Sequence, residues 1–153
     1  FGENKWTELQ GYIYGSYIQY AEIFNGFKKF LKKCNNEKID IIIISHKTVY
    51  PVLGPKINLR KAALNFLNQN LINEGLYYSN IYFENTINDK IKRINKFKFN
   101  YFIDDLIKIF ENKNFSKTIN PILFDPNTEI NNSDYKKINI LNNWNDILKY
   151  LFN

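Results

Sequence analysis

The sequence contains no methionine, a single cysteine and a single histidine, and it has no long hydrophobic run. One cysteine, Cys34, excludes an internal disulfide framework and suits a reducing compartment, so we expect a cytoplasmic protein. Its position in FKKFLKKCNN predicts a packing role near a helix end rather than a nucleophile. No apolar stretch approaches the roughly 18 residues that a membrane span needs, and no signal peptide is present, so we expect no membrane partner.

The absence of methionine also bears on the start of the chain. Because Phe1 is not a translation start, we expect it to be a cut end, a processed end or the first residue of a partial sequence. On this interpretation, part of the protein precedes Phe1.

The 153 residues are enough for one domain with a sizeable core. Their formal net charge of +6 favours anionic partners in general, such as phosphorylated small molecules, nucleic acid or acidic lipid. The lysines are scattered, as in KKFLKK and NDKIKR, and this pattern predicts a solvated surface. A basic nucleic-acid-binding module is the weaker interpretation, because the sequence has no basic-aromatic strand motif and no recognition-helix signature. We therefore expect no nucleic-acid partner.

Strand-like and helix-like segments alternate from residue 39 onward. The run IDIIIIS is typical of a strand buried on both faces, and the loop HKTVYPVLGPKI then leads to a helix that Asn58 caps and Gly75 closes. The predicted strands span 39–45, 80–84, 99–103 and 121–125, with a last strand or extended edge at 137–141, and the predicted helices span 58–75, 87–97, 106–113 and 143–152. This alternation predicts an α/β protein with a Rossmann-like, doubly wound parallel sheet.

The front of the chain differs from this pattern. Residues 6–24, WTELQGYIYGSYIQYAEIF, are rich in aromatic side chains and are predicted to be helical, as a lid or cap beside the sheet. Residues 25–38 are predicted to form the helix that leads into the first strand. We therefore expect a small helical cap segment over residues 1–24 and an α/β core over residues 25–153.

Polar residues follow the predicted strands, where parallel sheets bind their ligands. These residues are Ser45, Glu84, Asp104 with Asp105, and Asp125.

The neighbouring carboxylates Asp104 and Asp105 stand out, because two like charges at the end of a buried strand repel each other. A Mg²⁺ ion, which takes one or two carboxylates together with waters and phosphate oxygens, would offset this repulsion. The structural alternative is that one aspartate caps the following helix and the other is solvated.

Three further residues are candidates for an anion site. The hydroxyl of Ser45 at a strand end can bind a phosphate oxygen, although a hydroxyl at that place is common. Lys90 lies in the first turns of a helix, from where a lysine can reach an anionic ligand at the sheet edge, although the helix dipole disfavours a cation there. Lys92 and Arg93 are equally plausible from charge alone. His46, the only histidine, has no clear serine or cysteine partner, so a triad is not expected. It would either contact the substrate or cap the end of the strand.

The order strand–Ser45, Lys90, strand–Asp104–Asp105 resembles the haloacid dehalogenase superfamily, whose phosphatases carry four short motifs on a doubly wound sheet. IIIISHK looks like the second motif, Lys90 matches the lysine of the third, and FIDDL looks like the fourth. The likeness is strongest to a group of poorly characterised bacterial members, on WTELQGYIYG, ISHKTVYPVLGPK and FIDDL followed by ILFDPN. On this view the resemblance covers nearly the whole chain.

The resemblance implies a role for each of these residues. Ser45 would be the phosphate-binding hydroxyl and Lys90 the lysine that holds the phosphoryl group and the nucleophile, both of them catalytic. His46 and Lys47 would contact the substrate with Ser45 and Lys90. Asp104 and Asp105 would bind Mg²⁺.

The chain departs from the family at the first motif, an Asp-x-Asp pair that supplies the aspartate nucleophile and the general acid. No apolar strand ending in such a pair precedes residue 39. We therefore expect roughly 40 to 60 upstream residues, which would hold that motif and the central strand.

The full protein is then expected to be a Mg²⁺-dependent phosphatase that acts on a small phosphorylated metabolite through an aspartyl-phosphate, whereas this fragment alone would be inactive. The loop 46–57, with Tyr50 and Lys56, and the aromatic front would shape the substrate pocket. The alternative is a non-catalytic ligand-binding or regulatory domain on the same scaffold.

Overall fold

The computed structural model describes residues 2–153 as a mixed α/β protein of six α-helices and five strands. All strand pairs are parallel, and they form one sheet of two strands and one sheet of three. The predicted α/β class with parallel strands is therefore confirmed. The chain divides into two compact units: the first holds the described residues up to Ile23 together with Leu31–Thr86, and the second holds Phe24–Phe30 together with Ile87–Asn153.

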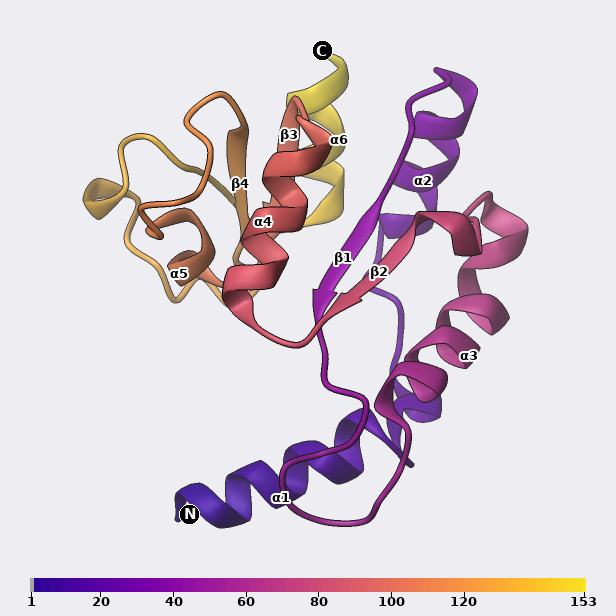
Figure 1. The fold of residues 1–153 in the computed structure, drawn as a ribbon. Helices are drawn as coiled ribbons and strands as arrows, with labels where there is room; N and C mark the ends of the chain where they lie inside the picture. The colour runs from indigo at the N-terminus through magenta and orange to yellow at the C-terminus, as the bar shows by residue number, and fades with distance from the viewer. Residues whose placement is uncertain (1) are drawn as a thin grey trace. The chain divides into compact units, whose positions relative to one another are not determined.

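The first unit is built on a βαβ element (Figure 1). Strand β1 (Ile43–His46) pairs in parallel with β2 (Ile81–Glu84), and α3 (Leu59–Leu71) lies in the connection between them. Two short 3-10 turns, η2 (Ile72–Glu74) and η3 (Tyr78–Asn80), lead from α3 to β2.

Both predicted ends of the α3 segment are present. The side chain of Asn58 accepts a hydrogen bond of 2.9 Å from the backbone N–H of Lys61, which satisfies one free donor of the first turn. At the other end Gly75 adopts a left-handed conformation with φ +94°, which only glycine adopts readily. Between these ends the helix buries Leu59, Ala63 and Leu71.

The aromatic front folds as α1 (Glu3–Tyr14) followed by the 3-10 turn η1 (Ile18–Tyr20). Gly11 is buried on α1 and allows close approach of the loop that follows β1. A Cβ atom on Gly11 would lie 2.8 Å from the carbonyl oxygen of Leu53 and 2.9 Å from Cβ of Pro51. The helix predicted within residues 6–24 is thus present, but it ends early, at Tyr14.

Helix α2 (Phe27–Asn36) occupies the helix predicted within residues 25–38. Leu31 is 0% exposed and Cys34 is 2% exposed, so the packing position expected for the single cysteine is confirmed.

The strand predicted over residues 39–45 is shorter and lies later, at Ile43–His46. The carbonyl oxygen of Ile41 accepts a hydrogen bond of 3.0 Å from the side-chain amide of Asn80. This carbonyl is therefore paired with a side chain and not with the backbone of a neighbouring strand. Ile39 is exposed. The apolar run therefore predicted a longer strand than its partner β2 supports.

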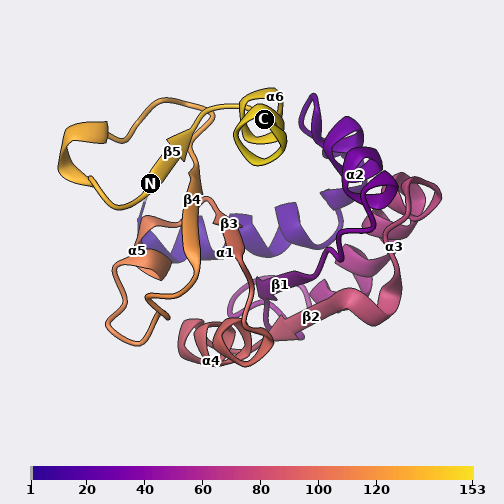
Figure 2. The same ribbon diagram turned by 90° about the horizontal axis from the view of Figure 1, so that it is seen from above.

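The second unit contains a parallel sheet with strand order β3-β4-β5. Figure 2 shows α4 and α5 on one face of this sheet and α6 on the other. The elements are β3 (Tyr101–Asp104), β4 (Asn120–Phe124), β5 (Asn139–Leu141), α4 (Ile87–Phe97), α5 (Ile107–Phe110), η4 (Asn132–Asp134) and α6 (Trp144–Phe152). The predicted helix over residues 87–97 is confirmed at both ends.

Apolar side chains from both faces of the sheet form the core of the second unit, where Ile94, Ile109, Ile122 and Ile147 are 0% exposed. An aromatic cluster extends this core. The rings of Phe27, Phe30 and Phe124 lie 4.6, 5.0 and 5.4 Å from the ring of Trp144. Such contacts add to the burial of apolar area.

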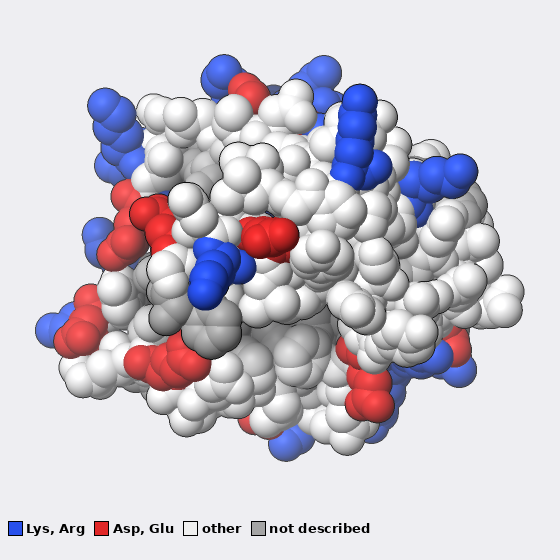
Figure 3. Space-filling view, turned by 90° about the horizontal axis from the view of Figure 1, so that it is seen from below, with Lys and Arg blue, Asp and Glu red and all other residues white. Residues whose placement is uncertain are grey.

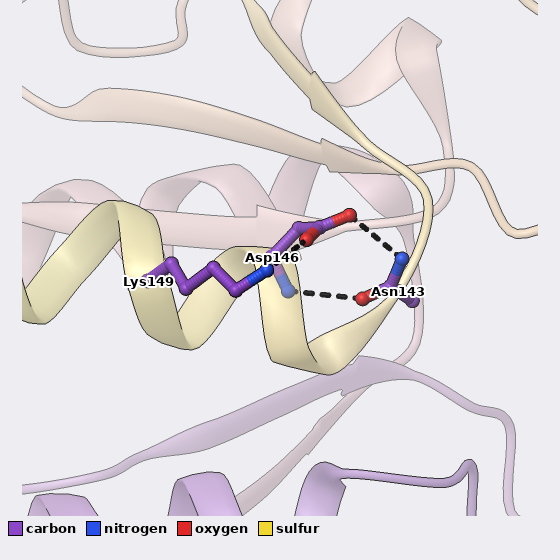
Figure 4. Close-up of polar contacts among 3 residues, drawn as sticks. All are labelled: Asn143, Asp146 and Lys149. Carbon is purple, nitrogen blue, oxygen red and sulfur yellow. Dashed lines mark hydrogen bonds and ion pairs between the residues drawn. The ribbon is translucent and has the colours of Figure 1, made fainter.

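Helix α6 has a reciprocal cap at its start (Figure 4). The side chain of Asn143 accepts a hydrogen bond of 2.9 Å from the backbone N–H of Asp146 and donates one of 2.7 Å to its carboxylate. Lys149, one turn later, lies 3.4 Å from the same carboxylate. This arrangement satisfies one free backbone donor of the first turn, the N–H of Asp146.

Helix α5 is shorter than the predicted helix over residues 106–113. The side chain of Asn112 accepts a hydrogen bond of 3.0 Å from the backbone N–H of Asn114, and this local bond competes with the helical pattern. Within residues 2–153, none of the helices combines the length and the apolar character needed to cross a bilayer. The division into a cap over 1–24 and a core over 25–153 stays a prediction.

Candidate functional site

The carboxyl end of β3 carries a buried ion pair. Asp104 is the last residue of β3, and Lys90 projects from α4, where Ile91 and Ile94 are also buried. The ammonium of Lys90 donates a hydrogen bond to Oδ2 of Asp104, and the two side chains are only 7% and 5% exposed. Lys90 and Asp104, which come from the segments that resemble the third and fourth motifs, therefore lie together within the second unit.

Burial and pairing act in opposite directions on Asp104. Removal from water raises the pKa of Asp104, because burial penalises the charged form. The ammonium of Lys90 and the backbone N–H of Leu106, which donates a bond of 3.0 Å to Oδ1, oppose this shift by stabilising the carboxylate. Both carboxylate oxygens of Asp104 are thus hydrogen-bonded.

An aromatic ring forms part of the surroundings of this pair. The ammonium of Lys90 lies 5.8 Å from the centre of the Phe102 ring, on the same strand as Asp104. In such a setting a cation and an anion interact more strongly than in water, and each is costly to leave without its partner.

Asp105 differs from its neighbour, because its side chain is exposed. The exposure of Asp105 agrees with the structural alternative for this pair, whereas α5 begins after Leu106 without a side-chain cap. Among residues 2–153, no group of three or more histidine, cysteine or acidic residues gathers closely enough to hold a metal ion. Two carboxylates with waters remain a suitable donor set for Mg²⁺, and metal binding by this pair stays a prediction.

Asp125, which follows β4, has a structural role. Its carboxylate accepts hydrogen bonds of 3.1 and 2.9 Å from the backbone N–H groups of Glu129 and Ile130, and its carbonyl accepts one of 2.7 Å from Asn142. The residue is 7% exposed and holds the loop after β4 in place.

In the first unit, Ser45, His46 and Lys47 lie at the end of β1. Ser45 is half-buried and pairs with Phe83 in the parallel register. His46 is exposed, and its Nε2 lies 3.0 Å from the carbonyl oxygen of Asn85.

Lys47, at the same end of β1, lies against an aromatic ring. It is half-buried, and its ammonium lies 4.4 Å from the centre of the Tyr14 ring, a cation–π contact with α1. Burial lowers the pKa of Lys47, because the charged form loses its hydration. Its ammonium is thus held on an aromatic face.

Arg60, which the sequence analysis did not single out, connects the two strand ends. Its Nε donates a hydrogen bond of 2.9 Å to the carbonyl of Lys47, and its Nη2 donates one of 2.7 Å to the side chain of Asn85. A cation in the first turn of α3, where the helix dipole favours acids, was the available signal.

The remaining candidates are Tyr50 and Lys56 in the loop after β1. The ammonium of Lys56 lies 5.2 Å from the centre of the Tyr50 ring. On the face drawn in Figure 3, the basic side chains lie singly or in small groups with acidic ones among them, as the scattered lysines predict.

Each unit therefore contributes its own part of the predicted site. The second unit brings Lys90 and Asp104 together, and the first unit brings Ser45, His46 and Lys47 together. That all of these surround one phosphate stays a prediction.

Comparison with known proteins adds no relative: no protein-family model, no curated protein and no solved structure matches this chain.

Proposed function

We propose that this chain is the larger part of a Mg²⁺-dependent phosphatase of the haloacid dehalogenase type, which hydrolyses a small phosphorylated metabolite through an aspartyl-phosphate. The observation that carries the proposal is the buried pair of Lys90 and Asp104 at the carboxyl end of β3. On the family resemblance, this lysine would hold the phosphoryl group and this acid its counter-ion, and buried titratable groups cluster at functional sites.

The proposed reaction has two steps, and the residues of the site bind the phosphoryl group and the rest of the substrate. A carboxylate oxygen of the upstream aspartate attacks phosphorus, the bond to the leaving oxygen breaks, and the general acid protonates that oxygen. Water then cleaves the acyl phosphate and releases inorganic phosphate. Lys90 holds the phosphoryl oxygens and the nucleophile, Ser45 donates to a phosphate oxygen, and His46 and Lys47 contact the rest of the substrate.

Asp104 and Asp105 would hold the metal ion, since a hard divalent cation takes one or two carboxylates together with waters and phosphate oxygens. When bound, Mg²⁺ supplies charge neutralisation for the phosphoryl group. Because Lys90 pairs with Asp104, the lysine also opposes the rise in the pKa of Asp104 that burial causes.

The test is hydrolysis of p-nitrophenyl phosphate by the full-length protein with Mg²⁺ and with a chelator. We expect turnover that needs Mg²⁺ and that is lost in the Asp104→Asn and Lys90→Met variants. Lys92→Met is the matched control, because Lys92 lies on the same helix, is exposed and pairs only loosely with Asp89 at 3.2 Å. Metal-dependent turnover that survives Asp104→Asn would overturn the assignment.

A non-catalytic ligand-binding domain on the same scaffold is the second candidate. The closed pair of Lys90 and Asp104 favours it, because a buried ion pair can be purely structural. The genomic reading frame upstream of Phe1 separates the two: an apolar strand that ends in Asp-x-Asp supports the enzyme, and its absence supports the binding domain.

A further inference from the structure

The first unit contains an aromatic hollow whose lining includes none of the residues to which the proposed phosphatase chemistry gives a task. Its volume is about 430 Å³, within the range of roughly 300 to 1,000 Å³ that is typical of small-molecule sites. It lies where α1, η1 and α3 meet, and η1 packs against α3 (Figure 1). Tyr14, Tyr17, Tyr20 and Phe66 supply its rings.

The tyrosines of this hollow expose their rings to solvent. Tyr17 is 57% exposed and Tyr20 is 73% exposed, and the two ring centres lie 6.3 Å apart at an interplanar angle of 37°. Tyr12 continues the row, with its ring centre 6.5 Å from that of Tyr17. The faces of tyrosine rings are electron-rich, so they attract a cation rather than an anion.

The charge at the hollow has the same preference. Among the described residues that line it, Glu22 alone is charged, and this residue is exposed. None of these described lining residues is basic, even though the whole chain carries a net charge of +6. An acid beside aromatic faces, in an otherwise basic protein, is complementary to a positive ligand.

The protein already uses one of these rings to hold a cation. The ammonium of Lys47 lies 4.4 Å from the centre of the Tyr14 ring and is not part of the lining. This contact shows that a ring of the hollow can hold an ammonium, and it leaves Tyr17, Tyr20 and Phe66 as the rings available to a ligand.

We propose that this hollow is an aromatic cage for a small organic cation that carries an alkylated ammonium group. Methyl groups on the nitrogen fill the apolar part of the volume, and the diffuse charge interacts with the faces of Tyr17 and Tyr20. Glu22 supplies the long-range attraction. The hollow adjoins the proposed phosphate site through the contact of Tyr14 with Lys47, but binding of a cation in it does not require phosphatase activity.

The test is a titration of the chain with choline and with its neutral isostere 3,3-dimethylbutan-1-ol, followed by NMR of the labelled tyrosine rings. We expect saturable shifts with choline at a dissociation constant of ~1 to 10 mM, and binding of the neutral isostere roughly fivefold weaker or more. Equal binding of the two compounds, or no saturable shift with choline, would overturn the proposal.

Variants separate ring electrostatics from simple apolar filling. Tyr17→Leu and Tyr20→Leu should each weaken choline binding about two- to fivefold while leaving the isostere unchanged, and Glu22→Gln should weaken choline in the same sense. Tyr77→Leu is the matched control, because Tyr77 is 65% exposed in the same unit and does not line the hollow. If Tyr77→Leu had the same effect as Tyr17→Leu, the specific cage would be ruled out.

Discussion

The ammonium of Lys90 donates a hydrogen bond to the carboxylate of Asp104 in the interior of the second unit, 14 residues apart in the chain. A buried pair of this kind contributes little to net stability, because desolvation of both charges offsets their attraction. Loss of one partner is different, since the remaining charge then stays buried without compensation. The pair therefore constrains mutation at both positions.

Replacement of Lys90 by methionine should lower the free energy of unfolding of the second unit by about 3 to 5 kcal/mol, because Asp104 would be left buried without its cation. The measurement is urea unfolding followed by fluorescence of Trp144, which packs in that unit, in a Trp6→Phe background. Lys92→Met on the same helix is the control and should change stability by no more than about 0.5 kcal/mol, because Lys92 is exposed.

The double variant Lys90→Met with Asp104→Leu tests the cause of that loss. Removing both charges should restore most of the stability, since an apolar pair of similar volume is often neutral or better. If the double variant is as unstable as Lys90→Met alone, packing rather than the unpaired charge explains the effect.

The titration of Asp104 should also appear in the pH dependence of stability. Burial raises the pKa of Asp104 in the folded protein, so between about pH 4, the unfolded value, and the raised folded value the folded state binds more protons. The stability that this proton provides is present below about pH 4 and is lost as pH rises through the folded pKa.

The stability of the wild type relative to Asp104→Asn should therefore fall as pH rises through that window and then become constant. The difference between the two proteins cancels the titration of other groups. In Lys90→Met the window should extend to higher pH, because the ammonium no longer opposes the effect of burial. A relative stability that rises with pH would contradict this assignment.

The parts of the fold that the sequence predicted are those fixed by local chemistry. The helix over residues 87–97, the cap at Asn58 and the left-handed glycine at Gly75 depend on propensity and on single side chains. The strand over 39–45 was misjudged because strand length depends on the partner, and β2 offers only Ile81–Glu84. A run of isoleucines alone does not contain that information.

The candidate site was predictable to a similar extent. Lys90 was selected among equivalent neighbours by its resemblance to a family motif, and the structure brings it to Asp104. The place of Arg60 in the first turn of a helix was a signal, but its hydrogen bonds and the loop-holding role of Asp125 could not be foreseen, because they depend on which backbone groups lie near a side chain after folding. That Ser45 lies with Lys90 and Asp104 around one phosphate stays a prediction.

Cys34 offers a third prediction, on thiol reactivity. Burial raises the pKa of the Cys34 thiol to about 11, so at pH 8 the folded protein should react with a disulfide reagent far more slowly than the unfolded chain. The reaction rate as a function of urea measures how often this part of the first unit opens. Rapid labelling in the absence of urea would show that Cys34 is accessible.

The same shift has a consequence at alkaline pH. Because the folded pKa is above the ordinary value of 9.0, the stability provided by the protonated thiol is lost as pH rises from about 9 to about 11. Relative to Cys34→Ala, which has no thiol, the wild type should lose of the order of 2 kcal/mol over this range. Parallel pH profiles of the two proteins would contradict the assignment.

Gly75→Ala is the last prediction. The backbone at Gly75 has φ +94°, and a Cβ atom there would collide with the carboxamide of Asn35, whose Nδ2 donates a hydrogen bond of 2.6 Å to the carbonyl of Glu74. The substitution combines left-handed strain of about 1 kcal/mol with the loss of that hydrogen bond, about 1 kcal/mol more, so we expect the first unit to be destabilised by about 2 kcal/mol. Gly2→Ala is the matched control, since nothing lies within 4 Å of its Cβ position and its φ is −70°. Thermal unfolding should show a clear decrease in the midpoint for Gly75→Ala and almost none for Gly2→Ala.

The additional variant Asn35→Ala separates the two causes, because it removes the collision but not the backbone strain. Gly75→Ala should therefore lower the stability less in the Asn35→Ala background. An unchanged loss of stability would assign the whole effect to backbone conformation.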